Sequence, residues 1–481
     1  MGNAPHAVGA TRSRSRSSAG GGGLNVNVGS LLLLVGGVFA VVSAFLARQG
    51  FTGRDHGKWQ ELACVLLYAK LTAFSLYDLV GIDLGTTYSV VAISQKNNVT
   101  VIPDVLGHVL IPSMVAFVPG GKVLVGRDAR AHRTKDPAHT IFNAKRFIGR
   151  TYEDVVQSKD AASYEFAVSK APNDVHHGVC FPVNVPGHRK CVSPIAIGAT
   201  IVGHLRAMAH AFVGHNQITK AVIAVPVDFD GVQRAATQKA FFAAGLHVSR
   251  ILEEPTAAAI AYGLHQDPSV NFILVFDFGG GTLDVSLLFT RAGSINVVDT
   301  IGDNNLGGED LDAKVAEVLT HKIAERIGTT LTSATSDMEE TYSDRTNDDP
   351  DQLPCTLAGI RRAAELLKRT LSYETSATAS CVVQMSGELL QARETVSIEM
   401  TRTELEEICS ELLARTLVPV KEIIEANHMT SEEIDAVVLV GGSSRIPWVR
   451  EHLAKMFDGR APLSDIDRDV AVAYGAARTL D

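Results

Sequence analysis

The feature that most constrains this chain is a short pattern that occurs twice. Residues 80–91 and residues 272–287 each contain an apolar run, an aspartate, a turn rich in glycine and threonine, and a second apolar run. Each copy predicts a β-hairpin, because two apolar runs joined by a glycine turn favour antiparallel pairing. The copies stand about 190 residues apart. A repeat on this scale predicts two related lobes that face each other.

The residue types of the two turns indicate phosphate binding. Glycine lets backbone N–H groups approach an anion closely, and threonine hydroxyls add further donors. An aspartate repels phosphate unless a divalent cation and its water lie between them, so Asp83 and Asp277 together predict magnesium. One hairpin alone could be an ordinary glycine turn, whereas two with matched aspartates favour a site. The sequence contains no G-x-x-x-x-G-K-[ST] loop, which excludes a P-loop mechanism.

Three further segments are candidates for the rest of a nucleotide site. Residues 437–447 predict a buried strand, a Gly-Gly turn and a helix that begins at Pro447, a suitable seat for adenosine. Residues 302–310 hold another Gly-Gly turn, which alone is typical of a plain turn and cap. Residues 361–372 predict a helix with Glu365, Lys368, Arg369 and Ser372 on one face, and spacing alone favours a solvated face.

Composition places the chain among ordinary folded proteins. Its 481 residues correspond to about three domain-sized units. With 46% hydrophobic and 20% charged residues it is neither disordered nor fibrous, and a net charge of −9 gives no positive field for nucleic acid. The six cysteines include no C-x-x-C pair, which excludes a zinc ribbon; Cys180 and Cys191 are candidates for one disulfide.

The amino-terminal region predicts entry into the secretory pathway. Residues 1–29 form a basic Ser/Gly tail expected to be disordered, and residues 30–47 form an uncharged apolar run. That run predicts a signal peptide or a membrane anchor, with cleavage slightly favoured; a buried core helix is the alternative. Residues 48–78 are an uncertain linker. Asn98-Val99-Thr100 is a glycosylation sequon that gives weak support for the endoplasmic reticulum, and the chain ends without a retrieval signal.

With these residues in view, the chain resembles the ATPase domain of the stress-70 (70-kDa heat-shock) chaperone family. The resemblance covers about residues 80–478, and the segment Glu254–Leu264 (EPTAAAIAYGL) is nearly diagnostic. It is also carried by Gly81–Ser89, His139–Arg150, Ala221–Val227, Arg250–Leu264, Phe276–Ser286, Gly302–Asp310, Leu439–Pro447 and Asp469–Ala477. The resemblance implies an α/β, duplicated actin-like (RNase H-like) fold with two lobes around a nucleotide cleft.

The resemblance also implies site residues, matched position by position. Lys145 is the implied catalytic lysine, with Asp83, Glu254, Asp277 and Thr282; Asp83, Glu254 and Asp277 hold magnesium largely through water. The implied nucleotide and ion contacts are Gly85, Thr86, Thr87, Tyr88, Gly279, Gly280, Gly281, Asp284, Gly307, Gly308, Glu309, Glu365, Lys368, Arg369, Ser372, Gly441, Gly442, Ser443, Arg445 and Asp469. This reverses the solvated-face interpretation of residues 361–372.

The resemblance further implies function and domain limits. It implies Mg-dependent hydrolysis of ATP to ADP, with K⁺ as a further candidate ion, and J-domain co-chaperones and exchange factors as partners that act through Pro226, Arg234 and Arg250. We expect lobe I at 79–266, lobe II at 267–465 with an acidic surface loop at 332–354, and a final helix at 466–481 that returns to lobe I. Each lobe is expected to hold a mixed five-stranded sheet.

The sequence departs from the family pattern at its carboxyl end and at position 253. After Ala477 only four residues remain, so we expect no peptide-binding β-sandwich, no lid and no client-peptide groove. With the amino-terminal signal, this resembles a microsomal branch of the family. Glu253 replaces the usual asparagine and is expected to perturb the charge of the metal site. A nucleotide-dependent interaction module with incidental hydrolysis is the alternative, and a sugar kinase is disfavoured because no polyol-binding pattern accompanies the aspartates.

Overall fold

The computed structural model describes residues 79–95, 98–133, 135–158, 164–172, 178–327, 353–386 and 391–479. These residues lie within one compact unit, Tyr77–Asp481. The expectations for residues 1–29, 30–47 and 48–78 therefore lie outside the described residues. The same holds for the expected loop at 332–354 apart from its last two residues, of which Leu353 is buried.

The first lobe is built on a sheet that contains the first predicted hairpin. Its strand order is β12-β11-β1-β2-β3, and β4 pairs with β2. β1 pairs antiparallel with β2 and parallel with β11, so the hairpin expected at 80–91 is confirmed. The strands are β1 (Leu79–Leu84), β2 (Tyr88–Gln95), β3 (Asn98–Val101), β4 (Ile111–Pro112), β11 (Lys220–Val225) and β12 (His247–Glu253).

The second lobe repeats this topology around the second hairpin. Its strands are β15 (Ser294–Asp303), β14 (Leu283–Arg291), β13 (Phe272–Phe278) and β18 (Ala436–Val440), in that order. β13 is antiparallel to β14 and parallel to β18, as β1 is to β2 and β11, which confirms the second hairpin. Within the described residues this sheet has four strands, so the expectation of five was wrong. In the fifth place the structure has one parallel bridge, between Val438 and Leu463.

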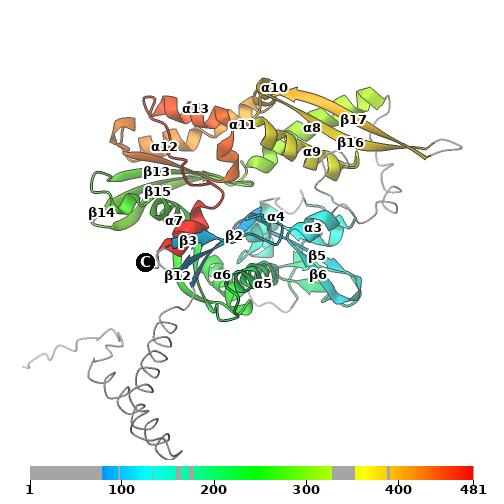
Figure 1. The fold of residues 1–481 in the computed structure, drawn as a ribbon, viewed down its shortest axis with the longest axis horizontal. Coiled ribbons are helices and arrows are strands. Elements are labelled where there is room, and N and C mark those ends of the chain that lie inside the picture. Colours follow the sequence, from blue (N-terminus) through cyan, green and yellow to red (C-terminus); the bar gives the residue numbers. More distant parts are fainter. Residues whose placement is uncertain are drawn as a thin grey trace, which may run out of the picture. The chain divides into compact units, whose positions relative to one another are not determined.

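Helices and smaller sheets surround these two sheets (Figure 1). A three-stranded sheet contains β5 (Met114–Val118), β6 (Lys122–Val125) and β7 (Thr140–Phe142), another contains β8 (Ser169–Lys170), β9 (Val179–Pro182) and β10 (Cys191–Val192), and β16 (Ser376–Ser386) pairs with β17 (Gln391–Thr401). The helices are α3 (Arg127–His132), α4 (Tyr152–Gln157), α5 (Pro194–Val213), α6 (Gly231–Ala243), α7 (Glu254–Ala261), α8 (Gly308–Ile327), α9 (Leu357–Leu371), α10 (Arg402–Ile408), α11 (Ser410–Arg415), α12 (Val418–Ala426), α13 (Pro447–Met456) and α14 (Ala471–Arg478).

The long helix α5 illustrates how local sequence sets an element. Its N-cap Ser193 accepts a hydrogen bond from the Ala196 N–H, Pro194 occupies the first turn, and Gly214 ends the helix at φ 77°. Among the described helices, α5 is the one long and apolar enough to cross a membrane by length and composition. Ile201 and Leu205, however, are buried in the core of the first lobe, as is typical of a core helix in a globular domain.

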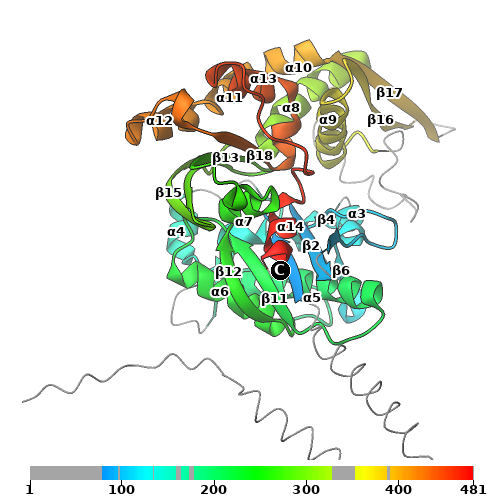
Figure 2. The same cartoon turned by 60° about the vertical axis from the view of Figure 1, so that its left-hand side comes forward.

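Helices α7 and α14 lie side by side at the junction of the two sheets, as Figures 1 and 2 show. Both are rich in alanine, and a Cβ on Gly475 would overlap the backbone of Ala257. Small side chains therefore let the two backbones approach closely. Ala257, Val275 and Val472 belong to one buried cluster that joins strands of both lobes. The final helix expected within 466–481 is present as α14, from Ala471 to Arg478, and it contacts β1, β2 and β11 of the first lobe.

Two disulfides stabilise the periphery. Cys180 in β9 pairs with Cys191 in β10, the pair that the sequence offered as a candidate. Cys355, just before α9, pairs with Cys381 in β16, which the sequence did not predict. The Cα atoms are 5.7 Å apart in the first pair and 5.0 Å in the second. Of the described cysteines, Cys409 is free and buried, and Cys64 lies outside the described residues.

Candidate functional site

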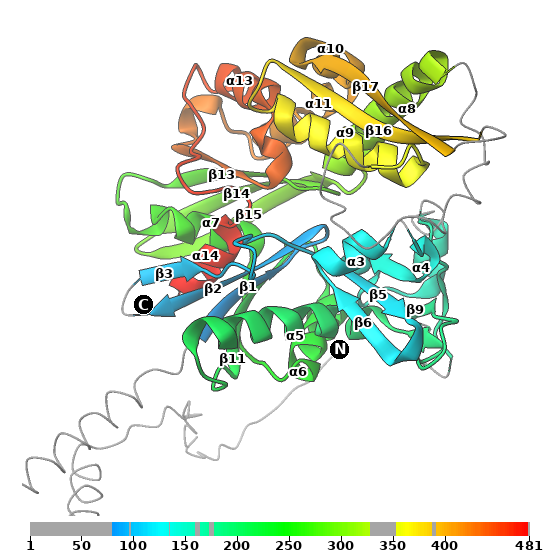
Figure 3. The ribbon, with the colours of Figure 1, turned by 45° about the vertical axis from the view of Figure 1, so that its right-hand side comes forward.

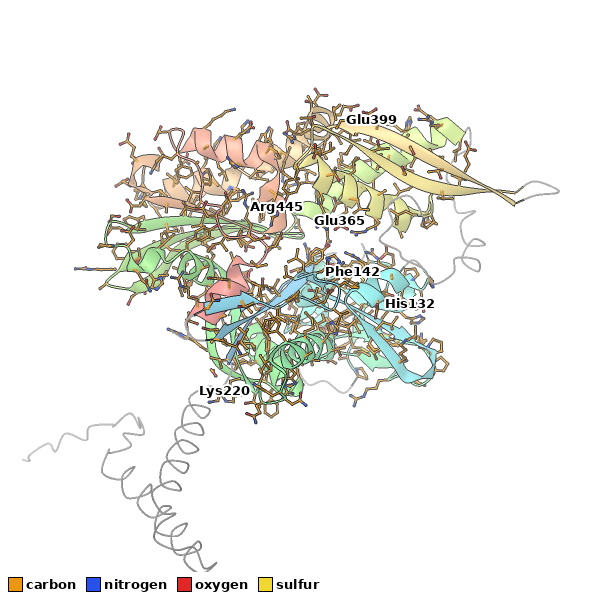
Figure 4. All side chains as sticks on the ribbon, viewed as in Figure 1. His132, Phe142, Lys220, Glu365, Glu399 and Arg445 are labelled. Carbon is orange, nitrogen blue, oxygen red and sulfur yellow. A yellow bond between two sulfur atoms is a disulfide. The ribbon has the colours of Figure 1, made fainter. Side chains whose placement is uncertain are left out.

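A single cleft of about 1760 Å³ is lined by side chains of both lobes. In Figure 4, Glu365 and Arg445 mark the side formed by the second lobe, and Phe142 and His132 mark the side formed by the first. Asp83 and Asp277 both line it, so the two hairpins contribute to one cavity. The other lining residues from the sequence-based set are Gly85, Thr86, Thr87, Tyr88, Lys145, Glu254, Gly279, Gly280, Gly281, Thr282, Asp284, Gly308, Glu309, Glu365, Lys368, Arg369, Ser372, Gly441, Gly442, Ser443, Arg445 and Asp469.

The turns of the two hairpins contact each other at the base of the cleft. A Cβ at Gly280 would overlap the Thr87 hydroxyl, so only glycine lets the second turn lie this close to the first. Gly307 is the one member of the sequence-based set that does not line the cleft. It packs behind the turn, where a Cβ would overlap the backbone of Gly280 and Gly281. Gly307 therefore supports the position of the turn.

Lys145 and Glu254 form the central ion pair of the cleft. Lys145 Nζ lies 2.6 Å from Glu254 Oε1, with 11% and 14% of the two side chains exposed. Lys145 lies in a short 3₁₀ helix, Ala144–Phe147, which begins after Asn143 in a left-handed conformation with φ 53°. Burial opposes the charged form of the lysine, but the carboxylates of Glu254 and Asp83 outweigh it and raise its pKa. Lys145 is therefore a fixed cation that faces the cleft.

Four carboxylates crowd the floor of the cleft around this lysine. Burial raises the pKa of Asp83 to about 7, against the attraction of Lys145, and repulsion from Glu254 adds to the rise. Burial and then Glu254 also raise the pKa of Asp284 to about 7. Asp277, opposite Asp284 in the β13–β14 pair, has its pKa raised well above the usual value for the same two reasons. One lysine does not balance this much negative charge.

The carboxylate cluster fits a hydrated cation better than a directly ligated one. Within the part of the chain that the structure describes, no group of three or more His, Cys, Asp or Glu side chains is arranged to hold a metal ion. Burial and neighbouring carboxylates raise the pKa of both Asp83 and Asp277, and a nearby cation would favour their ionised forms. Magnesium keeps most of its waters and takes substrate phosphates as ligands, so Asp83, Glu254 and Asp277 suit it through water.

Glu309 connects the two lobes beside the phosphate turns. It lies in the first turn of α8, where one carboxylate oxygen accepts from the Thr87 hydroxyl and the other from the Asn143 amide, each at 2.9 Å. The backbone N–H of Glu309 donates to the Gly280 carbonyl at 2.7 Å, and that of Gly308 to Gly279 at 3.1 Å. The start of α8 and the second hairpin turn thus form one rigid wall.

Helix α9 provides a polar wall on the second lobe. Lys368 is buried, and its Nζ donates to the Gly308 carbonyl at 2.7 Å and lies 2.8 Å from Asp312. Glu365 accepts from the Tyr88 hydroxyl of the first lobe at 2.9 Å. Although burial opposes it, the guanidinium of Arg362 outweighs this effect and lowers the pKa of Glu365 to about 2. The solvated-face interpretation from spacing alone is wrong, because this face lines the cleft.

The third glycine turn closes the cleft between β18 and α13. Gly441 has φ 78°, and its missing side chain leaves room for the Phe278 carbonyl. The Ser443 hydroxyl donates to the Gly279 carbonyl at 2.8 Å, which couples this turn to the second hairpin. Arg445 pairs with Asp469 at 2.9 Å and also with Asp467. The segment from 436 to 447 forms the strand, turn and helix that the sequence predicts.

Glu253 does not act on the metal site as expected from the sequence. Its carboxylate lies 3.5 Å from Arg234, on a side chain that is 36% exposed, and Glu253 does not line the cleft. Glu253 is the last residue of β12 and Glu254 is the first residue of α7, and of these two only Glu254 lines the cleft. The expectation of a perturbed metal site was therefore wrong.

Asp228, a carboxylate that was not among the residues predicted from the sequence, also lines the cleft. Burial first, and then Glu254, raise its pKa. Asp228 follows the end of β11, the parallel neighbour of β1, which carries Asp83. Because carboxyl ends of parallel strands meet at one sheet edge, this position was the signal that could have identified it. Arg146, which donates to the Gly281 carbonyl across the cleft, was also missed.

Comparison with known proteins agrees with this arrangement. Residues 79–480 match the family described as Hsp70 protein. The chain is 39% identical over 400 residues to a heat shock cognate HSP70 protein of Trypanosoma brucei brucei, a match that covers 83% of this chain and 55% of the relative. The chain thus spans about half the length of that relative. The match covers both hairpins, the cleft and the junction helices, and the chain belongs to the Hsp70 family.

Proposed function

We propose that this chain is a Mg-dependent ATPase that binds ATP between its two lobes and hydrolyses it slowly. Members of the Hsp70 family hydrolyse ATP, and the cleft of this chain holds the groups that such a reaction needs. The observation that carries the proposal is the convergence of Asp83, Asp277 and Lys145 in one cavity between two glycine turns. ADP is the product, and K⁺ is a further candidate ion.

The chain's own residues suit in-line attack of water on the γ-phosphate. Lys145 presents a fixed positive charge where negative charge grows on the transferred group, and the backbone of Gly279–Gly281 offers N–H donors to phosphate. Asp277 is placed to orient the attacking water. Magnesium, when bound, would offset charge on the phosphates and on Asp83, Glu254 and Asp277. The nucleoside would lie between α9 and the turn at 441–445.

The experiment is Mg-ATP turnover by the full chain and by Lys145→Ala. Loss of the lysine should reduce turnover at least about 100-fold, because one preorganised charge contributes about 3 kcal/mol to the transition state. Nucleotide affinity should change little. Lys239→Ala is the matched control, since that side chain is exposed on α6 and does not line the cleft. Unchanged turnover in Lys145→Ala would exclude this role for the lysine.

Location in the lumen of the endoplasmic reticulum is part of the proposal. The apolar run at 30–47 provides a signal or anchor, and two disulfides support an oxidising compartment because such bonds are rare in the cytosol. The test is to isolate the protein under thiol-blocking conditions and to count its free thiols. Free thiols at both cysteine pairs, Cys180–Cys191 and Cys355–Cys381, would argue against this location.

The alternative, a nucleotide-dependent interaction module, uses the same cleft. It is favoured by the bonds from Tyr88 to Glu365 and from Thr87 to Glu309, which make the angle between the lobes sensitive to what lies between them. J-domain co-chaperones and exchange factors are the proposed partners. Arg234 ties the cleft segment at 227–229 to α6 by donating to its carbonyls, which supports a role in coupling. Partner binding that differs between ATP and ADP in Lys145→Ala would favour this module.

A further inference from the structure

One sequence motif lies outside the cleft and is not used by the proposed function. Asn98-Val99-Thr100 is the only Asn-x-Ser/Thr tripeptide in the 481-residue sequence. It lies in β3, the edge strand of the first lobe's sheet, which pairs with β2. Asn98 is the first residue of that strand and is paired with Gln95 across the turn. None of the three residues lines the nucleotide cleft.

The register of β3 places the acceptor groups on one face. Val99 and Val101 pack against a buried cluster that includes Val90 and Ala473, beneath α14. Because side chains alternate along a strand, Asn98 and Thr100 point to the opposite face. Asn98 is exposed and Thr100 is partly exposed. Figure 3 shows β3 at the margin of the sheet, next to α14 and clear of the other lobe's helices α8 and α9.

We propose that Asn98 is an N-glycosylation site of this protein. This inference rests on the secretory part of the proposed function, because the sugar is added in the lumen of the endoplasmic reticulum. The donor class is an oligosaccharide linked to a lipid pyrophosphate. The Asn98 amide nitrogen forms a bond to C1 of the sugar, the bond from C1 to the pyrophosphate oxygen breaks, and the pyrophosphate leaves with the electron pair. The amide gives up one proton to the transferring enzyme's base.

A glycan at this position is compatible with the folded chain and with its ATP site. The exposed amide carries the sugar into solvent without moving Val99 or Val101 out of the core. The glycan would also cover an edge strand, whose unpaired backbone groups otherwise invite pairing with another chain. We therefore expect glycosylation to leave ATP turnover unchanged, within about twofold, and to lower the tendency of the protein to self-associate.

The test uses the full chain produced in eukaryotic cells, with and without an amidase that removes N-linked glycans. The treated protein should migrate faster by the mass of one glycan. Asn98→Gln and Thr100→Val should each abolish the shift, because the first removes the acceptor nitrogen and the second the hydroxyl of the sequon. Both changes are on the exposed face, and their far-UV circular dichroism should match that of the unaltered chain. Persistence of the shift in both variants would overturn the assignment to Asn98.

A reporter sequon separates failure of the site from failure of the location. Val298→Thr converts Asn296-Val297-Val298 into an acceptor pattern on β15, the edge strand of the other sheet, where Val298 is 47% exposed. A second glycan on this variant is the expected result. A glycan at the reporter alone would overturn the inference and leave the secretory location standing. No glycan at either position would overturn both, whereas the ATPase proposal is tested independently by turnover.

Discussion

At the scale of single residues, the floor of the cleft brings several buried carboxylates close together. Their mutual repulsion and their burial both disfavour the ionised forms. Asp277 and Asp284 face each other across the β13–β14 pair, and Glu254 acts on both. Burial makes ionisation of each aspartate costly, and each neighbouring carboxylate adds to that cost. Such a cluster is stable only with bound protons or a bound cation. The Mg-ATP that we propose as ligand would bring positive charge together with phosphate to this cluster.

The raised pKa of Asp284 predicts how stability depends on pH. Its value rises from 3.8 when unfolded to about 7 when folded, so between these values the folded state binds more protons than the unfolded one. Stability of the nucleotide-free protein should therefore be lost as pH rises from about 4 to about 7. Asp284→Asn should flatten this slope in chemical unfolding, and the exposed Asp458→Asn should not. An unchanged slope in Asp284→Asn would contradict the raised pKa.

At the scale of elements, glycines determine how closely the turns approach. Gly307→Ala should push the Gly280–Gly281 backbone away and lower affinity for ATP at least tenfold, since its Cβ has no room. Gly203→Ala in α5 is the matched control, because a Cβ there meets nothing within 4 Å and alanine favours a helix. Calorimetric titration of ATP into each variant gives the comparison. Equal ATP affinities of the two variants would show that the Gly280–Gly281 turn can shift without loss of binding.

The second disulfide constrains the helix that lines the nucleoside side of the cleft. Cys355 and Cys381 enclose all of α9, and Leu353 and Pro354 beside Cys355 also line the cleft. A loop of this length predicts a stabilisation of about 2–4 kcal/mol. Replacing both cysteines with alanine should lower the free energy of unfolding by this amount. Reductant should then no longer destabilise the protein through loss of this disulfide. Cys409→Ala, at a free thiol, should leave that dependence intact.

The two hairpins and the Gly-Gly turn were predictable because glycine turns between apolar runs leave few alternatives. The direction of the α9 polar face was not, since helical spacing defines a face without showing what it meets. Glu253 shows the same limit, because its strand position was visible but its partner Arg234 comes from α6. Asp228 differs, because its place just after β11 was a signal that could have identified it. In the second sheet the expected fifth strand is reduced to one bridge, between Val438 and Leu463.

At the scale of the whole described unit, the two lobes share one junction and one cleft. The junction is formed by the alanine-rich helices α7 and α14, which pack closely against each other and against strands of both sheets. Two side-chain hydrogen bonds join the lobes across the cleft. Tyr88 donates to Glu365, and Thr87 donates to Glu309. A triphosphate bound between the hairpins would compete with or replace these bonds, which links occupancy to the angle between the lobes.

The most direct measurement of the central claim is the affinity for ATP with and without magnesium, determined by calorimetry on the full chain and on Asp83→Asn/Asp277→Asn. The unaltered chain should bind at least about tenfold more tightly with magnesium, a gain of about 1.4 kcal/mol. The double variant should lose that gain, because it lacks both hairpin carboxylates that we propose to hold the hydrated ion. ATP binding that ignores magnesium in the unaltered chain, or a full gain in the double variant, would contradict the account.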